Sequence, residues 1–102
     1  MKFYTVDPTR KQFMLVDVPE IEAAMAMVGL KVLEVDHGVV FRDHSGGPSL
    51  GIVVYQYSIA ECPDTFMLYG RRFYGNAIVY GFDFEGVSID VPDELPEIVW
   101  GS

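Results

Sequence analysis

Only one stretch of this chain has the apolar spacing of a helix, and this constrains the fold more than any other feature. Ile21, Met25 and Val28 are four and three residues apart, which places them on one helical face. Pro19 is tolerated in a first helical turn, and Gly29 is typical of the residue that follows a helix. We therefore expect a single helix between Pro19 and Gly29.

The remaining apolar residues occur in short runs that have the length and period of β-strands. Asp7-Pro8 predicts a turn between the first two runs, because aspartate caps turns and proline presets the backbone. Residues 50–57 contain a continuous apolar run, which is typical of a buried strand. We expect strands at 2–6, 12–18, 30–35, 39–42, 50–57, 65–69, 73–80 and 87–91, with further turns at 37–38, 70–72 and 81–86.

Consecutive strands joined by short turns pair antiparallel. We therefore expect an α+β fold, in which a mostly antiparallel sheet of about six to eight strands carries the single N-terminal-half helix on one face. The 102 residues, half of them apolar, suit one domain spanning 1–102. Residues 92–102 are expected to form an extended or turn-like tail, because this segment contains Pro92 and Pro96, which disfavour helix in the preceding residues. Trp100 is expected to dock on the sheet or to contact a partner.

The charged residues are distributed unevenly, and the C-terminal part is strongly acidic. The formal net charge is −8, and all seven lysine and arginine residues precede residue 73. Such a surface suits a basic partner and argues against direct binding to nucleic acid or to an anionic membrane. The acids from residue 73 onward are Asp83, Glu85, Asp90, Asp93, Glu94 and Glu97.

The sequence also predicts a soluble protein of a reducing compartment. The apolar run after Met1 is interrupted by Asp7-Pro8, so it is too short for a signal peptide, and no run is long enough for a membrane helix. Cys62 is the single cysteine, which excludes an intramolecular disulfide and suits the cytoplasm. We expect Cys62 to be an inert, partly buried thiol.

The repeated dipeptides Asp36-His37 and Asp43-His44 suggest either a metal site or turn residues. Histidine with carboxylate suits zinc or iron. However, a strand between the two dipeptides would hold them roughly 20 Å apart. We therefore expect turn residues that cap their own backbone, and no metal or cofactor.

Arg71 and Arg72 form the only adjacent arginine pair and provide an alternative site for a small anion. Tyr69 and Tyr74 lie beside them in the sequence. Two guanidinium groups could hold a phosphate or a carboxylate. Strand alternation would place the two arginines on opposite faces unless a turn brings them together, and the simpler interpretation is a solvated turn.

Catalytic signatures are absent from the sequence. It contains no GxSxG, P-loop or GxGxxG pattern, and no spacing singles out a carboxylate pair. We expect no enzyme and no catalytic residues. Phe82 and Phe84 flank Asp83 in a predicted turn, and Glu85 follows. They predict an aromatic and acidic contact patch, to which Trp100 could add a further anchor.

Two groups of residues carry a resemblance to a known family. One is Tyr4-Thr5-Val6-Asp7-Pro8 together with Met27-Val28-Gly29 and Leu33-Glu34-Val35; the other is residues 74–81 with Gly86. They resemble a family of small, functionally uncharacterised proteins of bacteriophages and prophages. The resemblance implies a phage accessory protein in the cytoplasm of a bacterial host. It carries over no activity and no catalytic residue.

Three hypotheses of function follow. The first is a non-enzymatic module that inhibits a basic host protein or complex, in the manner of anti-CRISPR inhibitors, with carboxylates replacing phosphates. The same acids could instead be a solvated face that keeps a β-rich domain monomeric. The second is a binder that sequesters an anionic nucleotide or metabolite at Arg71 and Arg72. The third is a self-associating structural phage component, and monomer and homodimer both remain open.

Overall fold

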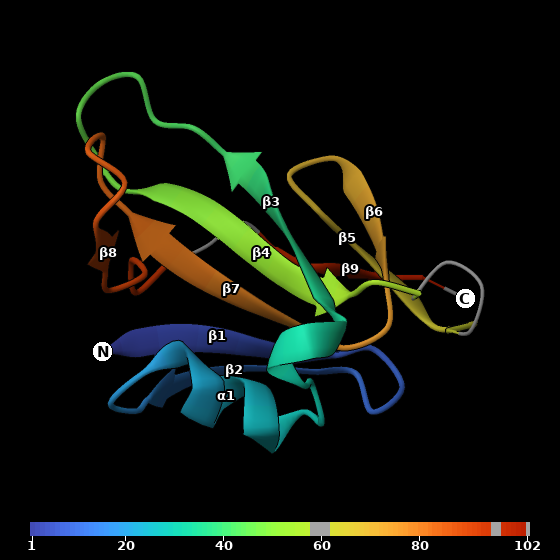
Figure 1. Cartoon of the computed structure of the whole chain (residues 1–102). Helices are drawn as coiled ribbons and strands as arrows, with labels where there is room; N and C mark the ends of the chain where they lie inside the picture. Colours follow the sequence, from blue (N-terminus) through green and yellow to red (C-terminus); the bar gives the residue numbers. More distant parts are fainter. Residues whose placement is uncertain (58–61, 95–96, 102) are drawn as a thin grey trace.

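The computed structural model describes residues 1–57, 62–94 and 97–101 (Figure 1). Two sheets form within these residues. The elements are β1 (Lys2–Asp7), β2 (Gln12–Asp17), α1 (Ile21–Met27), the 3₁₀ helix η1 (Val32–Glu34), β3 (Val35–Phe41), β4 (Ser49–Tyr55), β5 (Thr65–Leu68), β6 (Arg71–Tyr74), β7 (Ala77–Phe82), β8 (Ser88–Ile89) and β9 (Val99–Trp100).

The larger sheet has six strands in the order β2-β1-β7-β4-β3, with β8 also paired to β7. The smaller sheet has the order β6-β5-β9, and all pairings in both sheets are antiparallel. The expected α+β class and mostly antiparallel pairing are confirmed. The larger sheet falls within the expected six to eight strands, but the expected single sheet is corrected, because the described residues form nine strands, six in the larger sheet and three in the smaller.

Each face of the larger sheet has its own apolar core. On one face, Ala24 and Met25 of α1 pack with Phe3, Val53 and Ile78, which come from three neighbouring strands. The other face packs against the smaller sheet. In Figure 1, α1 and the smaller sheet therefore lie at different positions around the larger sheet. The side chains of this second core that are at most 2% exposed are Val6, Leu50, Ile52, Ala77 and Val79 from the larger sheet, and Phe66 and Leu68 from the smaller.

The stretch expected as a turn at 70–72 and a strand at 73–80 is instead two strands in different sheets. The turn lies at Tyr69-Gly70, both in the left-handed region with φ of 52° and 75°, and it leads directly into β6. Gly75 then has φ of 75°, and its N–H donates to the Asp64 carbonyl at 2.9 Å. The chain therefore changes sheets at Gly75, a conformation that glycine adopts without a Cβ clash.

The turn expected at His37-Gly38 is also wrong. Both residues lie within β3, where His37 pairs with Val53 and Gly38 pairs with Ile52. The expected strand at 30–35 is replaced by η1 and the first residue of β3. Pairing with the central strand β4 outweighs the local turn preference of a histidine–glycine dipeptide, because strand preference depends mainly on the neighbours that a residue meets.

The C-terminal segment runs from the larger sheet to the smaller one. The Val91 N–H donates to the Lys2 carbonyl at 3.2 Å. The backbone at Asp90 also passes close to Gly81, where a Cβ would lie 2.9 Å from the Asp90 carbonyl oxygen. Residues 97–101 resume on the smaller sheet, where Trp100 pairs with Phe66 and packs partly buried against the core. Of the two expectations for Trp100, docking on a sheet is confirmed. In the described residues, no helix has the length and apolar character needed to span a membrane.

Candidate functional site

The turn between β7 and β8 is braced by hydrogen bonds to its own aspartate. The Asp83 Oδ1 atom accepts the N–H groups of Glu85 and Val87, both at 2.9 Å. The backbone of Asp83 also donates to the Val87 carbonyl and accepts from the Gly86 N–H, both at 3.0 Å. Gly86 takes a left-handed φ of 82°, which closes the turn. We call residues 83–87 the Phe84 turn.

Phe84 projects from this turn with 89% of its surface exposed. Glu85 beside it is exposed, and Val87 is 54% exposed. Phe82, which was expected in the turn, is instead the last residue of β7 and is half-buried, with the Arg42 guanidinium 5.9 Å from its ring centroid. The turn therefore offers one large apolar side chain and an adjacent carboxylate on a fixed backbone.

Replacing Asp83 by alanine is expected to loosen the turn. The variant loses the acceptor of two backbone N–H bonds, which costs about 1 kcal/mol of unfolding free energy. Asp83→Asn retains an Oδ1 acceptor without the charge and should keep most of this stability. Urea unfolding of both variants measures the difference. Equal losses in the two variants would show that charge, and not the acceptor, holds the turn.

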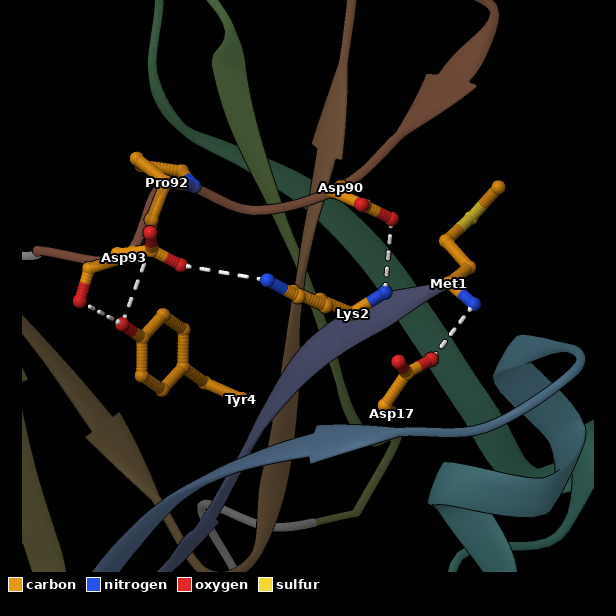
Figure 2. A network of polar contacts seen from close by, with 7 residues as sticks. All are labelled: Met1, Lys2, Tyr4, Asp17, Asp90, Pro92 and Asp93. Atoms are coloured by element: carbon orange, nitrogen blue, oxygen red, sulfur yellow. Dashed lines mark hydrogen bonds and ion pairs between the residues drawn. The ribbon is translucent and has the colours of Figure 1, made fainter.

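Asp90 and Asp93 are occupied by contacts with β1, as Figure 2 shows. The Lys2 N–H donates to Asp90 Oδ1 at 2.9 Å, and the Lys2 Nζ atom lies 3.6 Å from Asp93 Oδ1. On the neighbouring strand, Asp17 is paired with the Met1 ammonium at 3.0 Å. Two of the six C-terminal acids therefore help to fasten the chain after β8 to β1, and Lys2 offsets part of their charge.

Tyr4 anchors the same segment from inside the molecule. Its hydroxyl lies within hydrogen-bond distance of the backbone carbonyls of Asp93 and Pro92, at 2.8 and 3.1 Å (Figure 2). Its ring stacks on Phe13 with centroids 4.7 Å apart. Burial raises the pKa of the Tyr4 hydroxyl above its ordinary value of 10.0, and the charges of Asp93 and Glu94 raise it further. The folded protein thus favours the neutral phenol, which can donate to these carbonyls.

Alkaline pH is expected to destabilise the fold through this tyrosine. Because the folded pKa lies above the unfolded value, the stabilisation is complete below pH 10.0 and is lost as the pH rises through the folded pKa. Tyr4→Phe should lose about 1 kcal/mol near neutral pH and show a smaller further loss at high pH. Urea unfolding at about pH 8 and about pH 10.5 measures both effects. Tyr69 and Tyr80, whose pKa values burial also raises, should contribute to the loss that remains.

The other acids predicted to form the site are divided between the two sheets. Glu85 is on the Phe84 turn beside the larger sheet, Glu94 follows the segment fastened to β1, and Glu97 precedes β9 of the smaller sheet. All three are exposed. The structure therefore brings together Phe82, Asp83, Phe84 and Glu85, and it places Trp100 in the other sheet.

The arginine pair lines a pocket between the two sheets. Arg71, Arg72 and Tyr74 border a cavity of about 260 Å³. The Arg71 side chain lies on the same face of β6 as the buried Phe73, toward the larger sheet, whereas strand alternation places the Arg72 side chain on the other face. Tyr69 does not line it and stacks on Phe41 with centroids 4.8 Å apart. Sequence reasoning missed the opposite wall, which includes Asp36, because only the pairing of β3 with β4 carries that residue to the pocket.

The two aspartate–histidine dipeptides have different surroundings. Asp43 Oδ1 accepts from the Ser45 N–H at 2.8 Å and from the Ser45 hydroxyl at 2.6 Å, which lowers the pKa of its carboxyl group. The capping interpretation is therefore confirmed for Asp43. It is wrong for Asp36-His37, which lies in β3, where the His37 ring is 6.2 Å from the Tyr80 ring. Among the residues that the structure describes, no three His, Cys, Asp or Glu side chains form a metal-binding group.

Comparisons of the chain with protein-family models, with curated proteins and with solved structures gave no match.

Proposed function

We propose that this chain is a non-enzymatic acidic module that binds a basic surface of another protein through the Phe84 turn. The observation that carries the proposal is the 89% exposure of Phe84 on a turn that Asp83 fixes. Aromatic side chains dominate the energetics of protein interfaces. A backbone that is already ordered loses little conformational entropy on binding, so more of the contact energy appears as affinity.

The charge of the chain supports a basic partner. The net charge is −8, and Glu85 stands next to the aromatic anchor. Opposite charge around such an anchor speeds association and disfavours acidic competitors. Glu94 and Glu97 extend the negative charge away from the turn. Asp90 and Asp93 also contact β1, through the Lys2 backbone N–H and the Lys2 ammonium respectively. We therefore assign recognition first to Phe84 and Glu85, and only secondarily to the other exposed acids.

We extend the proposal to a phage-encoded inhibitor of a host defence complex, with exposed carboxylates standing where phosphates would bind. Its support is the sequence resemblance to phage and prophage proteins, together with the acidic charge. Arginine and lysine rows that hold phosphates can also hold carboxylates. The partner of this class would be a nucleic-acid-binding protein with such a row.

Affinity capture from a bacterial lysate at low and high salt tests the proposal. The tagged protein should enrich one basic protein or complex, and high salt should release it. The double variant Glu85→Lys/Glu94→Lys should lose this partner. Glu20→Lys/Glu22→Lys changes the net charge equally but alters exposed residues at the start of α1, and it should keep the partner. No enriched partner, or equal loss in both double variants, would contradict the proposal.

A further inference from the structure

A second feature, separate from the Phe84 turn, is the pocket between the two sheets. It has a volume of about 260 Å³ and is lined by β3 and β4 of the larger sheet and by β6 of the smaller. Asp36 lies on the β3 side, and Arg71 and Arg72 lie on the β6 side. The pocket is therefore bordered by both a carboxylate, that of Asp36, and a guanidinium group, that of Arg71.

These opposite charges do not neutralise one another directly. None of the ion pairs found among the described residues joins Asp36 to either arginine. The side chains of Asp36 and Arg71 are exposed, so water solvates their charges in the free protein. A ligand that carries both charges could replace that water on the two walls at once.

Arg71 is already positioned by its surroundings. Its guanidinium donates to the Val39 carbonyl of β3 and lies over the Phe73 ring, 5.4 Å from the ring centroid. A guanidinium has five N–H donors, so others remain for a ligand. Ordering of this side chain before binding lowers the entropy that a ligand contact would cost.

The apolar part of the pocket comes from core side chains. Ile52 and Phe73 line it and are 2% and 8% exposed, and Val54 lies beside them. Binding sites for small molecules combine such apolar walls with a few polar groups that fix orientation. The pocket thus offers one place for a carboxylate, one for a cation and one for a short apolar chain.

We propose that this pocket binds a small zwitterion of the amino-acid class, with an apolar side chain. The carboxylate would pair with Arg71, the ammonium with Asp36, and the side chain with Ile52 and Phe73. A simple anion is expected to bind more weakly, because it leaves Asp36 unpaired and meets its negative charge. A simple amine is expected to bind more weakly, because it leaves Arg71 unpaired and meets its positive charge.

Nuclear magnetic resonance of the methyl groups of Ile52 and Val54 tests this proposal, with L-leucine as the probe. L-Leucine should shift these methyl signals saturably with a Kd at or below about 1 mM. Two controls share its apolar skeleton: 4-methylpentanoate lacks the ammonium group, and 3-methylbutylamine lacks the carboxylate. Each control should bind at least about tenfold more weakly, since it loses one of the two charged contacts.

Two exposed-site variants assign the charges. Arg71→Gln should weaken L-leucine binding by about tenfold or more, and Asp36→Asn should do the same while leaving 4-methylpentanoate binding equal or tighter. Circular dichroism verifies that each variant remains folded. An absence of saturable shifts with L-leucine would overturn the proposal. Binding of 4-methylpentanoate as tightly as L-leucine would also overturn it and would indicate an anion site instead.

Discussion

Replacing Phe66 by alanine is expected to remove about 3–5 kcal/mol from the free energy of unfolding. Phe66 is fully buried between the two sheets, and its ring stacks on Phe73 with centroids 5.4 Å apart. It also pairs with Trp100 of β9. Truncation would therefore leave a cavity where the smaller sheet meets the larger one. Small domains have a total stability of about 5–15 kcal/mol, so this loss is a large part of the whole.

Urea unfolding measures this effect, and Phe84→Ala provides the matched control. The control removes the same ring from an exposed position and should change the unfolding free energy by less than about 0.5 kcal/mol. A loss below about 1 kcal/mol for Phe66→Ala would contradict the two-sheet core, because removing a ring from a packed interior costs more free energy than that.

Phe84→Ala is expected to weaken binding of the captured partner by about 30-fold or more, which corresponds to a hot-spot loss of at least about 2 kcal/mol. The ring is 89% exposed in the free protein, so its burial would occur only in the complex. Isothermal titration of the purified partner with wild type and variant measures this change. Stability should be almost unaffected, in contrast with Phe66→Ala.

Leu33→Ala is the control for this second prediction. Leu33 is 91% exposed in η1 and is therefore as accessible as Phe84, but it belongs to a different part of the surface. The affinity of Leu33→Ala should equal that of wild type. Equal weakening by Leu33→Ala and Phe84→Ala would contradict a contact centred on the Phe84 turn, because it would show that exposed apolar groups contribute without regard to position.

Local sequence signals predicted the strands whose neighbours are close in the chain. The first two strands, β1 and β2, form a hairpin around Asp7-Pro8, and the apolar run at 50–57 contains most of β4. In these cases the turn residues and the strand pattern favour the same structure. The general class of the fold follows from these agreements.

The division into two sheets could not be predicted in the same way. Residues 73–80 are apolar apart from Gly75 and Asn76, and nothing local indicates that β6 pairs with β5 while β7 pairs with β1 and β4. The left-handed Gly75 makes the change of sheet, yet a glycine inside a strand pattern equally suggests a bulge. His37-Gly38 likewise became part of β3 because β4 lies beside it.

The candidate site was predictable in its residues and not in its arrangement. The order of Asp83, Phe84 and Glu85 was enough to suggest an aromatic and acidic patch. The pairing of Asp90 and Asp93 with Lys2 was not, because these residues are about ninety positions apart in the chain. The same reason hid Asp36 from the arginine pair, since the packing of the two sheets against each other places them at one pocket.

Photocrosslinking tests the central claim, namely that the Phe84 turn is the contact surface for a basic partner. The photoreactive residue p-benzoylphenylalanine would be incorporated at position 84 in one protein and at position 33 in another, and each would be irradiated with the captured partner. We predict a crosslink to a lysine- or arginine-rich segment of the partner from position 84 and none from position 33. A crosslink from position 33 in the absence of one from position 84 would contradict the account.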